Sequence, residues 1–332
     1  MSNVRLHPIK VDVRFPRTSL QEAYERSKHA ERWVFSDSVC SSVTLIYGRS
    51  NVGKSYLVAA MLLSLLIEGR EFLGMQPTDN TKLWRPAILW TDPGSDEEYA
   101  ERICKHSPVE VDIPMFHIGR TVSAGEWEAL IDLLVDDGFN FVVLDNLMGA
   151  TGDTNNPEAV TTVFDGMTRL TNLGVPVVII HHESEHGASV AGATPMGASV
   201  IVQKSRTWIQ VRQTGRRKLR GDNTALVIRG NGLAQPQQLV AQPMIGPDYR
   251  VLNRGPWVTQ ETSKPKDGNA EVVDFIVDKC QGSGVNAVAK ELTMHFPGRA
   301  WGTWKDQLVR GDLSTLLIRD GEGISTSWRA AA

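Results

Sequence analysis

One eight-residue stretch of the sequence has residue types at a spacing that binds phosphate. Residues 48–55, GRSNVGKS, satisfy the pattern G-x-x-x-x-G-K-S/T. The apolar run 43–47 leads into the first glycine, and an apolar helical pattern opens at the lysine, as the pattern requires. Backbone N–H groups of such a loop surround phosphate oxygens, the lysine reaches the β- and γ-phosphates, and the hydroxyl holds Mg²⁺. We therefore predict a site for ATP and Mg²⁺ at Gly48, Arg49, Ser50, Asn51, Val52, Gly53, Lys54, Ser55 and Tyr56.

A carboxylate that follows a second apolar run could complete this site. Asp145 ends the run 141–144, FVVL. At the carboxyl end of a buried strand it would lie beside the phosphates and order Mg²⁺ together with Ser55. The alternative is a helix cap or a turn former. The phosphate loop upstream favours the metal role.

Hydrolysis also needs a group that polarises water. Asp92 follows the apolar run 87–91 and could act as the general base. The alternative is a turn-forming aspartate before Pro93. Ser95 and Glu98 are predicted to be the N-cap and N3 residues of a capping box that starts the next helix.

A third stretch, His182-Glu183-Ser184-Glu185-His186, matches H-E-x-x-H, the pattern of zinc-dependent proteases. That pattern binds zinc only on a helix, where residues i and i+4 share a face. The β-branched run 175–180 precedes it and a glycine-rich segment follows, so the context predicts a strand end and a loop. We therefore expect no zinc site.

The elements that position these residues alternate between strands and helices, which predicts an α/β fold with a mainly parallel sheet flanked by helices. Strands are expected at 43–47, 87–91, 115–118, 141–144, 175–180, 207–211 and 225–229, and helices near 54–68, 95–106, 124–136 and 157–173. The expected organisation is an N-terminal segment with a short helix at 1–37, an ATPase core at 38–250, a linker at 251–269 and a small domain at 270–332.

Composition limits the remaining possibilities. The 332 residues carry a net charge of −3, so any nucleic-acid contact must come from a local basic cluster, such as 212–220. Three cysteines without metal-ligand spacing fit a reducing compartment. The sequence shows no signal peptide and no apolar run that could cross a membrane. A cytoplasmic protein with no membrane contact is expected.

The order of these parts resembles the RecA-like ATPases, and within them the RepA-type hexameric replicative helicases and their plasmid and phage relatives. The resemblance runs from about Trp33 to Gly232 and is carried by "WVFSDSVCSSVTLIYGRSNVGKS", "EGREFLGMQPTDNTKLWRPAILWTDPGSDEEYAERI", "VVLDNLMGATGDTNNPEAV" and "GVPVVIIHHES". It implies a RecA-like core that binds single-stranded DNA in the channel of a homo-oligomeric ring, most simply a hexamer.

The resemblance also implies roles for single residues. Lys54, Ser55 and Asp145 match the family's motifs directly, and His181 or His182 matches its γ-phosphate sensor. The family usually has glutamate where this chain has Asp92. "RRKLRGDN" is similar to the element that reaches a neighbour's nucleotide, which implies that Lys218 and Arg220 are fingers acting in trans. The alternative for those two residues is a plain basic loop.

Two glycine-rich segments, 149–156 and 183–199, occupy the positions that line the channel in the RecA-like rings. The resemblance implies contact with single-stranded DNA there, although these segments hold few basic residues and no aromatic ones. A flexible lid or spacer is the alternative.

The C-terminal residues predict a winged-helix-like domain. Helices are expected at 270–280, 285–296 and 300–309, followed by a hairpin around 320–323. Duplex DNA could bind near the third helix through Arg299, Trp301, Trp304, Lys305 and Arg310. The alternatives are a protein-contact module, and a core role for the two tryptophans.

Three functional hypotheses follow. The leading one is an ATP-dependent DNA motor, a ring-forming replicative helicase of a plasmid or phage. The second is a recombination mediator or helicase loader that uses ATP as an assembly switch without unwinding. The third is a monomeric small-molecule phosphotransferase. It would give the candidate fingers Lys218 and Arg220 no function, because a monomer has no neighbouring nucleotide.

The zinc alternative has a direct test. The purified protein is expected to contain no stoichiometric zinc, and chelators that spare Mg²⁺ are expected to leave ATP hydrolysis unchanged. Elemental analysis that found one zinc per chain would contradict this interpretation of residues 182–186.

Overall fold

The structure is a computed structural model that describes residues 17–119, 122–184, 192–197, 199–214, 222–257, 266–296, 300–321 and 326–330. The chain divides into two compact units, Met1–Val258 (unit 1) and Thr259–Ala332 (unit 2). No helix among the described residues is long and apolar enough to cross a membrane.

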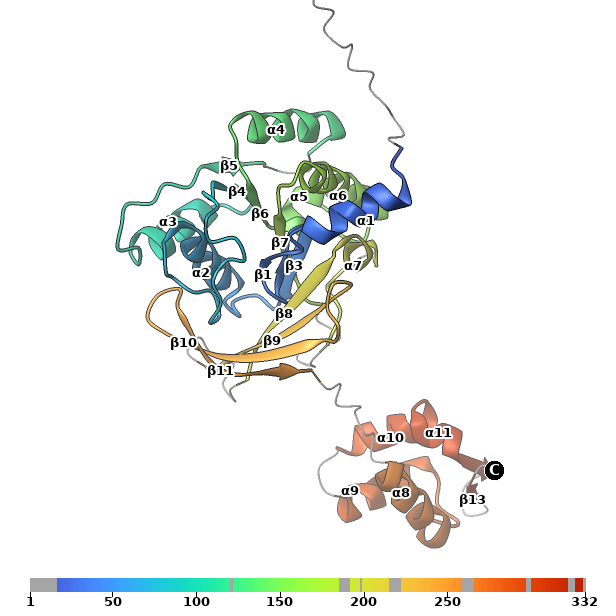
Figure 1. Ribbon diagram of the computed structural model, residues 1–332. Coiled ribbons are helices and arrows are strands. Elements are labelled where there is room, and N and C mark those ends of the chain that lie inside the picture. Colours follow the sequence, from blue (N-terminus) through green and yellow to red (C-terminus); the bar gives the residue numbers. More distant parts are fainter. Residues whose placement is uncertain are drawn as a thin grey trace, which may run out of the picture. The chain divides into compact units, whose positions relative to one another are not determined.

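Unit 1 is built on one large sheet (Figure 1). Within the described residues this sheet has nine strands in the order β11-β10-β9-β8-β3-β7-β6-β4-β5. The strands from β8 to β5 are parallel to their neighbours, and β9, β10 and β11 continue the sheet in antiparallel pairs. Their bounds are β3 Val43–Gly48, β4 Pro86–Trp90, β5 Met115–His117, β6 Phe141–Asp145, β7 Val177–His182, β8 Thr207–Gln213, β9 Thr224–Gly230, β10 Gln237–Pro243 and β11 Tyr249–Pro256.

Helices cover both faces of this sheet because its central strands are apolar on both sides. Along β3, for example, Leu45 packs into one core and Ile46 into the other. The first core contains α2 (Lys54–Leu66) and α3 (Ser95–Cys104). The second contains α4 (Ala124–Asp136), α5 (Leu147–Thr151), α6 (Pro157–Asn172) and α7 (Val200–Lys204). Figure 1 shows the two groups on opposite sides of the strands.

Two smaller elements precede the sheet. Helix α1 (Leu20–His29) begins with a capping box formed by Ser19 and Glu22, and none of its residues is buried. A short hairpin of β1 (Trp33–Phe35) and β2 (Val39–Cys40) leads into β3.

The mainly parallel sheet flanked by helices is confirmed, and the expected strands and helices lie within a few residues of the observed ones. Three details were wrong. The linker predicted at 251–269 begins inside β11 and ends inside α8 (Lys266–Lys279). Ser95 is the first helical residue of α3, and the N-cap is Gly94, whose φ is +82°. The glycine-rich segment predicted at 149–156 begins inside α5.

Unit 2 has its own apolar core. It contains α8, α9 (Val285–His295), α10 (Trp301–Val309), α11 (Asp312–Leu316) and a hairpin of β12 (Leu317–Asp320) and β13 (Ser327–Ala330). Trp304 is 3 % exposed and belongs to this core, whereas Trp301 is 40 % exposed. The alternative of a core role therefore holds for Trp304 and not for Trp301. Arg299 lies outside the described residues.

Candidate functional site

The phosphate-binding loop connects β3 to α2 at the carboxyl edge of the sheet. Gly48 ends β3 so close to β8 that a Cβ atom there would lie 2.4 Å from the carbonyl oxygen of Val211. Gly53 has a φ of +94° and Asn51 one of +62°. Glycine adopts such backbone angles without strain, and asparagine tolerates them better than most residues. The two glycines of the pattern are therefore required by close approach and by backbone conformation respectively.

Lys54 is folded back onto this loop. Its Nζ donates hydrogen bonds to the carbonyl oxygens of Gly48 (3.0 Å) and Arg49 (2.8 Å), and the residue is 7 % exposed. Burial lowers the pKa of Lys54 to about 8, while the carboxylates of Asp145 and Glu183 act in the opposite direction. A buried ammonium on this loop is the charge that phosphate binding needs.

Asp145 and Ser55 meet although they are far apart in the sequence. β7 lies between β3 and β6 in the sheet, so their carboxyl ends share one edge. Ser55 Oγ donates to Asp145 Oδ2 at 3.2 Å. A hydroxyl and a carboxylate are hard oxygen ligands of the kind that Mg²⁺ takes together with phosphate and water. The residues present therefore fit the predicted Mg²⁺, which Ser55 would hold directly and Asp145 would hold through water.

Tyr99 on α3 belongs to the same site, and the sequence analysis missed it. Its hydroxyl donates to Asp145 Oδ2 at 2.8 Å, and its ring is buried. Burial raises the pKa of Asp145, and the hydrogen bonds from Tyr99 and Ser55 oppose that rise. Burial and the adjacent carboxylate raise the pKa of Tyr99 well above its usual value, so the hydroxyl stays a donor. A tyrosine on the apolar face of a helix needs a polar partner, which was the available signal.

Asp92 stands just beyond β4, on the strand next to Asp145. Asn146 Nδ2 donates to Asp92 Oδ2 at 2.7 Å, and Thr91 Oγ1 donates to Asp92 Oδ1 at 3.2 Å. The backbone carbonyl of Asp92 accepts from the Ser95 N–H at 3.1 Å, so Asp92 also forms the turn before α3, which is the alternative role considered for it. The carboxylate is exposed and fixed in orientation at the edge of the site, which is the placement that a general base requires.

The side chain of Asn146 is itself held by the residues that follow it. Its Oδ1 accepts from the backbone N–H of Gly149 at 2.9 Å, and a Cβ at Gly149 would lie 2.1 Å from Thr91 Oγ1. Gly149 therefore allows α5 to pack against Thr91, and that packing sets the position of the Asn146 amide.

The two histidines at the end of β7 have different surroundings. His181 is fully buried, and its Nε2 donates to the carbonyl of Met196 at 2.7 Å. Burial lowers the pKa of His181 to about 4, so its ring is neutral at physiological pH. His182 is half-buried, and burial and the Lys54 ammonium lower its pKa, with Asp92 opposing. Because β7 is extended through His182, the helical spacing of the zinc-protease pattern is absent at its first residue.

A cavity of about 690 Å³ opens beside the loop. Its lining includes Arg49 and Ser50 of the loop, together with His182 and Glu183 at the end of β7. His182 therefore faces the space next to the phosphate loop, whereas His181 anchors the segment at Met196. Glu183 was not singled out as a site residue from the sequence. It is 4 % exposed and accepts a hydrogen bond from Gln210 Nε2 at 3.1 Å.

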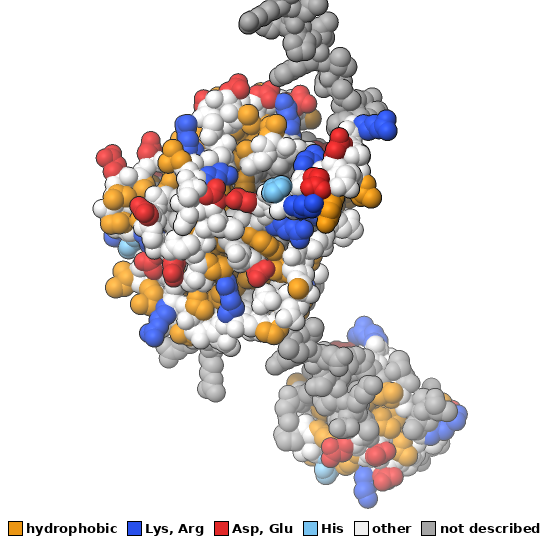
Figure 2. Space-filling model, viewed as in Figure 1, with side chains coloured by type: hydrophobic (Ala, Val, Ile, Leu, Met, Phe, Trp, Pro, Cys, Tyr) orange, Lys and Arg blue, Asp and Glu red, His pale blue; other side chains and the backbone are white. Residues whose placement is uncertain are grey.

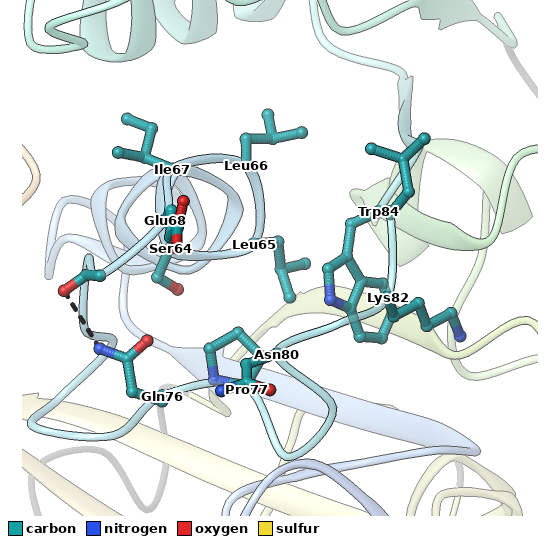
Figure 3. A pocket seen from close by; sticks show the side chains of 12 residues that line it. Ser64, Leu65, Leu66, Ile67, Glu68, Gln76, Pro77, Asn80, Lys82 and Trp84 are labelled. Atoms are coloured by element: carbon teal, nitrogen blue, oxygen red, sulfur yellow. Dashed lines mark hydrogen bonds between the residues drawn. The ribbon is translucent and has the colours of Figure 1, made fainter.

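A second cavity, of about 470 Å³, lies at the other end of α2 (Figure 3). The carboxyl end of α2 and the segment around Gln76 and Trp84 line it, and Gln76 Nε2 donates to the carbonyl of Gly69 at 3.1 Å. The 13 residues of α2 separate this cavity from the phosphate loop by roughly 20 Å. It is not part of the candidate site.

The candidate trans fingers Lys218 and Arg220 lie outside the described residues, as does His186. Among the residues that the structure describes, no three His, Cys, Asp or Glu side chains are grouped to hold a metal ion. The Mg²⁺ considered above would instead be held by one hydroxyl, one carboxylate and the nucleotide.

The Tyr99 hydrogen bond generates a prediction. Tyr99→Phe removes one donor from a buried carboxylate, which is worth about 1.5 kcal/mol, so Mg²⁺-dependent ATP hydrolysis is expected to fall roughly tenfold. Steady-state rates across a Mg²⁺ titration measure this. Tyr24→Phe, at an exposed tyrosine of α1, is the matched control and should leave the rate unchanged. Equal rates for Tyr99→Phe and wild type would contradict the role given to this hydroxyl.

Comparison with known proteins places this site in a family. Residues 12–188 match the family model described as AAA domain, and this range contains the phosphate loop, Asp92, Asp145 and both histidines. No curated protein matches the sequence. The match covers just over half of the 332 residues, so the chain belongs to the AAA domain family of P-loop ATPases.

Proposed function

We propose that the protein is an ATP-dependent DNA motor, a ring-forming replicative helicase of a plasmid or phage. The observation that carries this proposal is the fixed Asp92 carboxylate beside the Ser55–Asp145 pair. A P-loop protein that only binds nucleotide does not need an oriented carboxylate next to its metal ligands. A hydrolase does, because the attacking water must lose a proton.

In this proposal each residue has one task. The loop and Lys54 bind the phosphates, and Ser55 and Asp145 hold Mg²⁺, which neutralises charge on the transferred phosphoryl group. Asp92 accepts the proton of the attacking water, and Asn146 keeps its carboxylate turned toward that water. Tyr99 keeps Asp145 ionised by donating to it.

The segment that follows β7 supports coupling of hydrolysis to DNA. Its returning part is tied to the two histidines at one point. His181 Nε2 donates to Met196 O, and Met196 N–H donates to His182 O at 3.0 Å. A displacement of His182 by the γ-phosphate would therefore reach residues 192–197 directly. This contact supports the proposal that the 183–199 segment carries the response to single-stranded DNA.

The proposed ring rests on the resemblance of "RRKLRGDN" to a trans-acting element, with Lys218 and Arg220 completing a neighbour's site. A winged-helix-like assignment of unit 2 is supported by α8, α9 and α10 and by the β12–β13 hairpin, with the short helix α11 preceding that hairpin. On α10, Trp301 is exposed and Lys305 Nζ lies 5.3 Å from its ring centroid, a pair suited to contact duplex DNA.

One observation favours the second candidate, a helicase loader or recombination mediator that uses ATP as an assembly switch. The base is an aspartate, one methylene shorter than the usual glutamate, and both of its oxygens accept hydrogen bonds from the protein. Both features favour slow hydrolysis, which suits a switch better than a motor.

The test measures ATP hydrolysis and particle mass on the same samples, with and without single-stranded DNA. Wild type is expected to hydrolyse ATP, to assemble beyond a monomer and to separate a forked DNA. Lys54→Ala should lose hydrolysis because the phosphates lose their cation, whereas Lys105→Ala, at a lysine whose side chain is 65 % exposed, should not. Hydrolysis and assembly without strand separation would favour the switch. Neither hydrolysis nor assembly in wild type would exclude both.

A further inference from the structure

A cluster of aromatic and cationic side chains lies where the 183–199 segment rejoins the sheet. It consists of Trp208 on β8, Arg229 on β9 and Trp257 just after β11, and we refer to it as the tryptophan–arginine cluster. The Arg229 Cζ atom lies 5.9 Å from the Trp208 ring centroid and 5.6 Å from that of Trp257. All three side chains are half-buried, so each keeps part of its surface in solvent.

Arg229 connects the cluster to the segment. Its Nη2 donates to the Tyr47 hydroxyl at 2.7 Å and to the carbonyl oxygen of Ala193 at 3.4 Å. The Tyr47 hydroxyl also donates to Ala193 O at 2.7 Å. The Nε atom of Arg229 is buried and has no hydrogen-bond partner among the residues that the structure describes.

Gly192 brings the segment into contact with one of those rings. Its φ is +87°, and a Cβ atom there would lie 2.6 Å from Trp257 Cη2. The backbone N–H of Gly192 donates to Gln210 Oε1 at 2.7 Å. The returning chain is thus held against Trp257 on one side and β8 on the other, and the cluster sits where the segment rejoins the sheet.

The tryptophan–arginine cluster supplies the aromatic and cationic side chains that the two glycine-rich segments lack. Proteins that bind single strands without sequence preference stack bases on aromatic rings and add cation–π contributions from arginine. The segments themselves carry no aromatic residue, but the fold places two tryptophans and an arginine at their base. By contrast, Figure 2 shows acidic side chains over α4, whose exposed residues include Glu126, Glu128, Asp132 and Asp136. That face would repel a phosphate backbone.

We propose that the tryptophan–arginine cluster is a stacking subsite for the bases of single-stranded nucleic acid, with Trp257 as the main platform. The proposal rests on the proposed function, because it gives the strand that the motor binds a defined contact. Arg229 positions both rings and supplies positive charge. The subsite is tolerant of sequence, because every base has a π face.

A purely structural role for the cluster predicts a different result. If these side chains only anchor Ala193, loss of the anchoring hydrogen bonds would matter as much as loss of the ring. Tyr47→Phe removes the hydroxyl that bonds to both Ala193 and Arg229 and keeps an aromatic ring in place. It is therefore the matched control for Trp257→Leu, which removes the platform.

The experiment titrates the full-length protein with (dT)20 and (rU)20, following tryptophan fluorescence and, separately, the anisotropy of labelled oligonucleotide. Wild-type fluorescence is expected to be quenched by the strand. Trp257→Phe should bind within about threefold of wild type with reduced quenching, because phenylalanine stacks but does not supply the signal. Trp257→Leu should bind roughly tenfold more weakly. Tyr47→Phe and Trp84→Phe, the latter at a tryptophan that is 6 % exposed, should bind and be quenched like wild type.

Salt dependence separates stacking from general damage. Stacking releases no counterions, so the slope of log K against log salt should be the same for Trp257→Leu and wild type. Equal affinity of Trp257→Leu and wild type, undiminished quenching in Trp257→Phe, or equal losses in Tyr47→Phe and Trp257→Leu would each overturn the subsite and leave the proposed function standing. A wild type that binds neither oligonucleotide would overturn both.

Discussion

The structure depends on a carboxylate that is buried next to a lysine. Asp145 and Lys54 are both largely removed from water, and burial alone would neutralise each of them. Hydrogen bonds to each group oppose that effect. Ser55 and Tyr99 donate to the carboxylate, and the ammonium donates to two carbonyls of its own loop. The site can therefore exchange these internal partners for phosphate and Mg²⁺ without first exposing a charge to solvent.

The fold brings together the groups that compensate these two buried charges. Because β7 lies between β3 and β6, it separates the phosphate loop from the strand end that carries Asp145. The end of β7 places His182 and Glu183 between these two parts of the site. Gly48 lets β3 lie close to β8, and Gly149 lets α5 approach Thr91, so that Asn146 reaches Asp92. Each of these contacts lies at one edge of the sheet. A shift at the nucleotide would thus reach several elements at once.

The sequence predicted those parts of the site whose signal is local. The glycine pattern located the loop, and apolar runs that end in Asp92 and Asp145 located two strand ends, because carboxyl ends of parallel strands meet at one edge. Tyr99, Asn146 and Glu183 were missed because their roles depend on partners 46, 54 and 27 residues away. β10 and β11 were missed for a related reason. In β10, glutamines mask the alternation of Leu239 and Ala241, whose side chains are buried in the first core once the strand joins the sheet. The tryptophan–arginine cluster likewise exists only after β3, β8, β9 and the end of β11 are brought together.

The central claim is that this edge of the sheet hydrolyses ATP with Asp92 as the base. The most direct measurement is single-turnover hydrolysis by Asp92→Asn, with ATP binding followed in parallel and with Asp96→Asn, at an aspartate in the first turn of α3, as the control. Asparagine keeps the size of the side chain and the contact with Asn146 but cannot take a proton. We expect ATP binding to be retained and hydrolysis to fall about a hundredfold or more, with Asp96→Asn unchanged. Hydrolysis by Asp92→Asn within a few-fold of wild type would contradict the account.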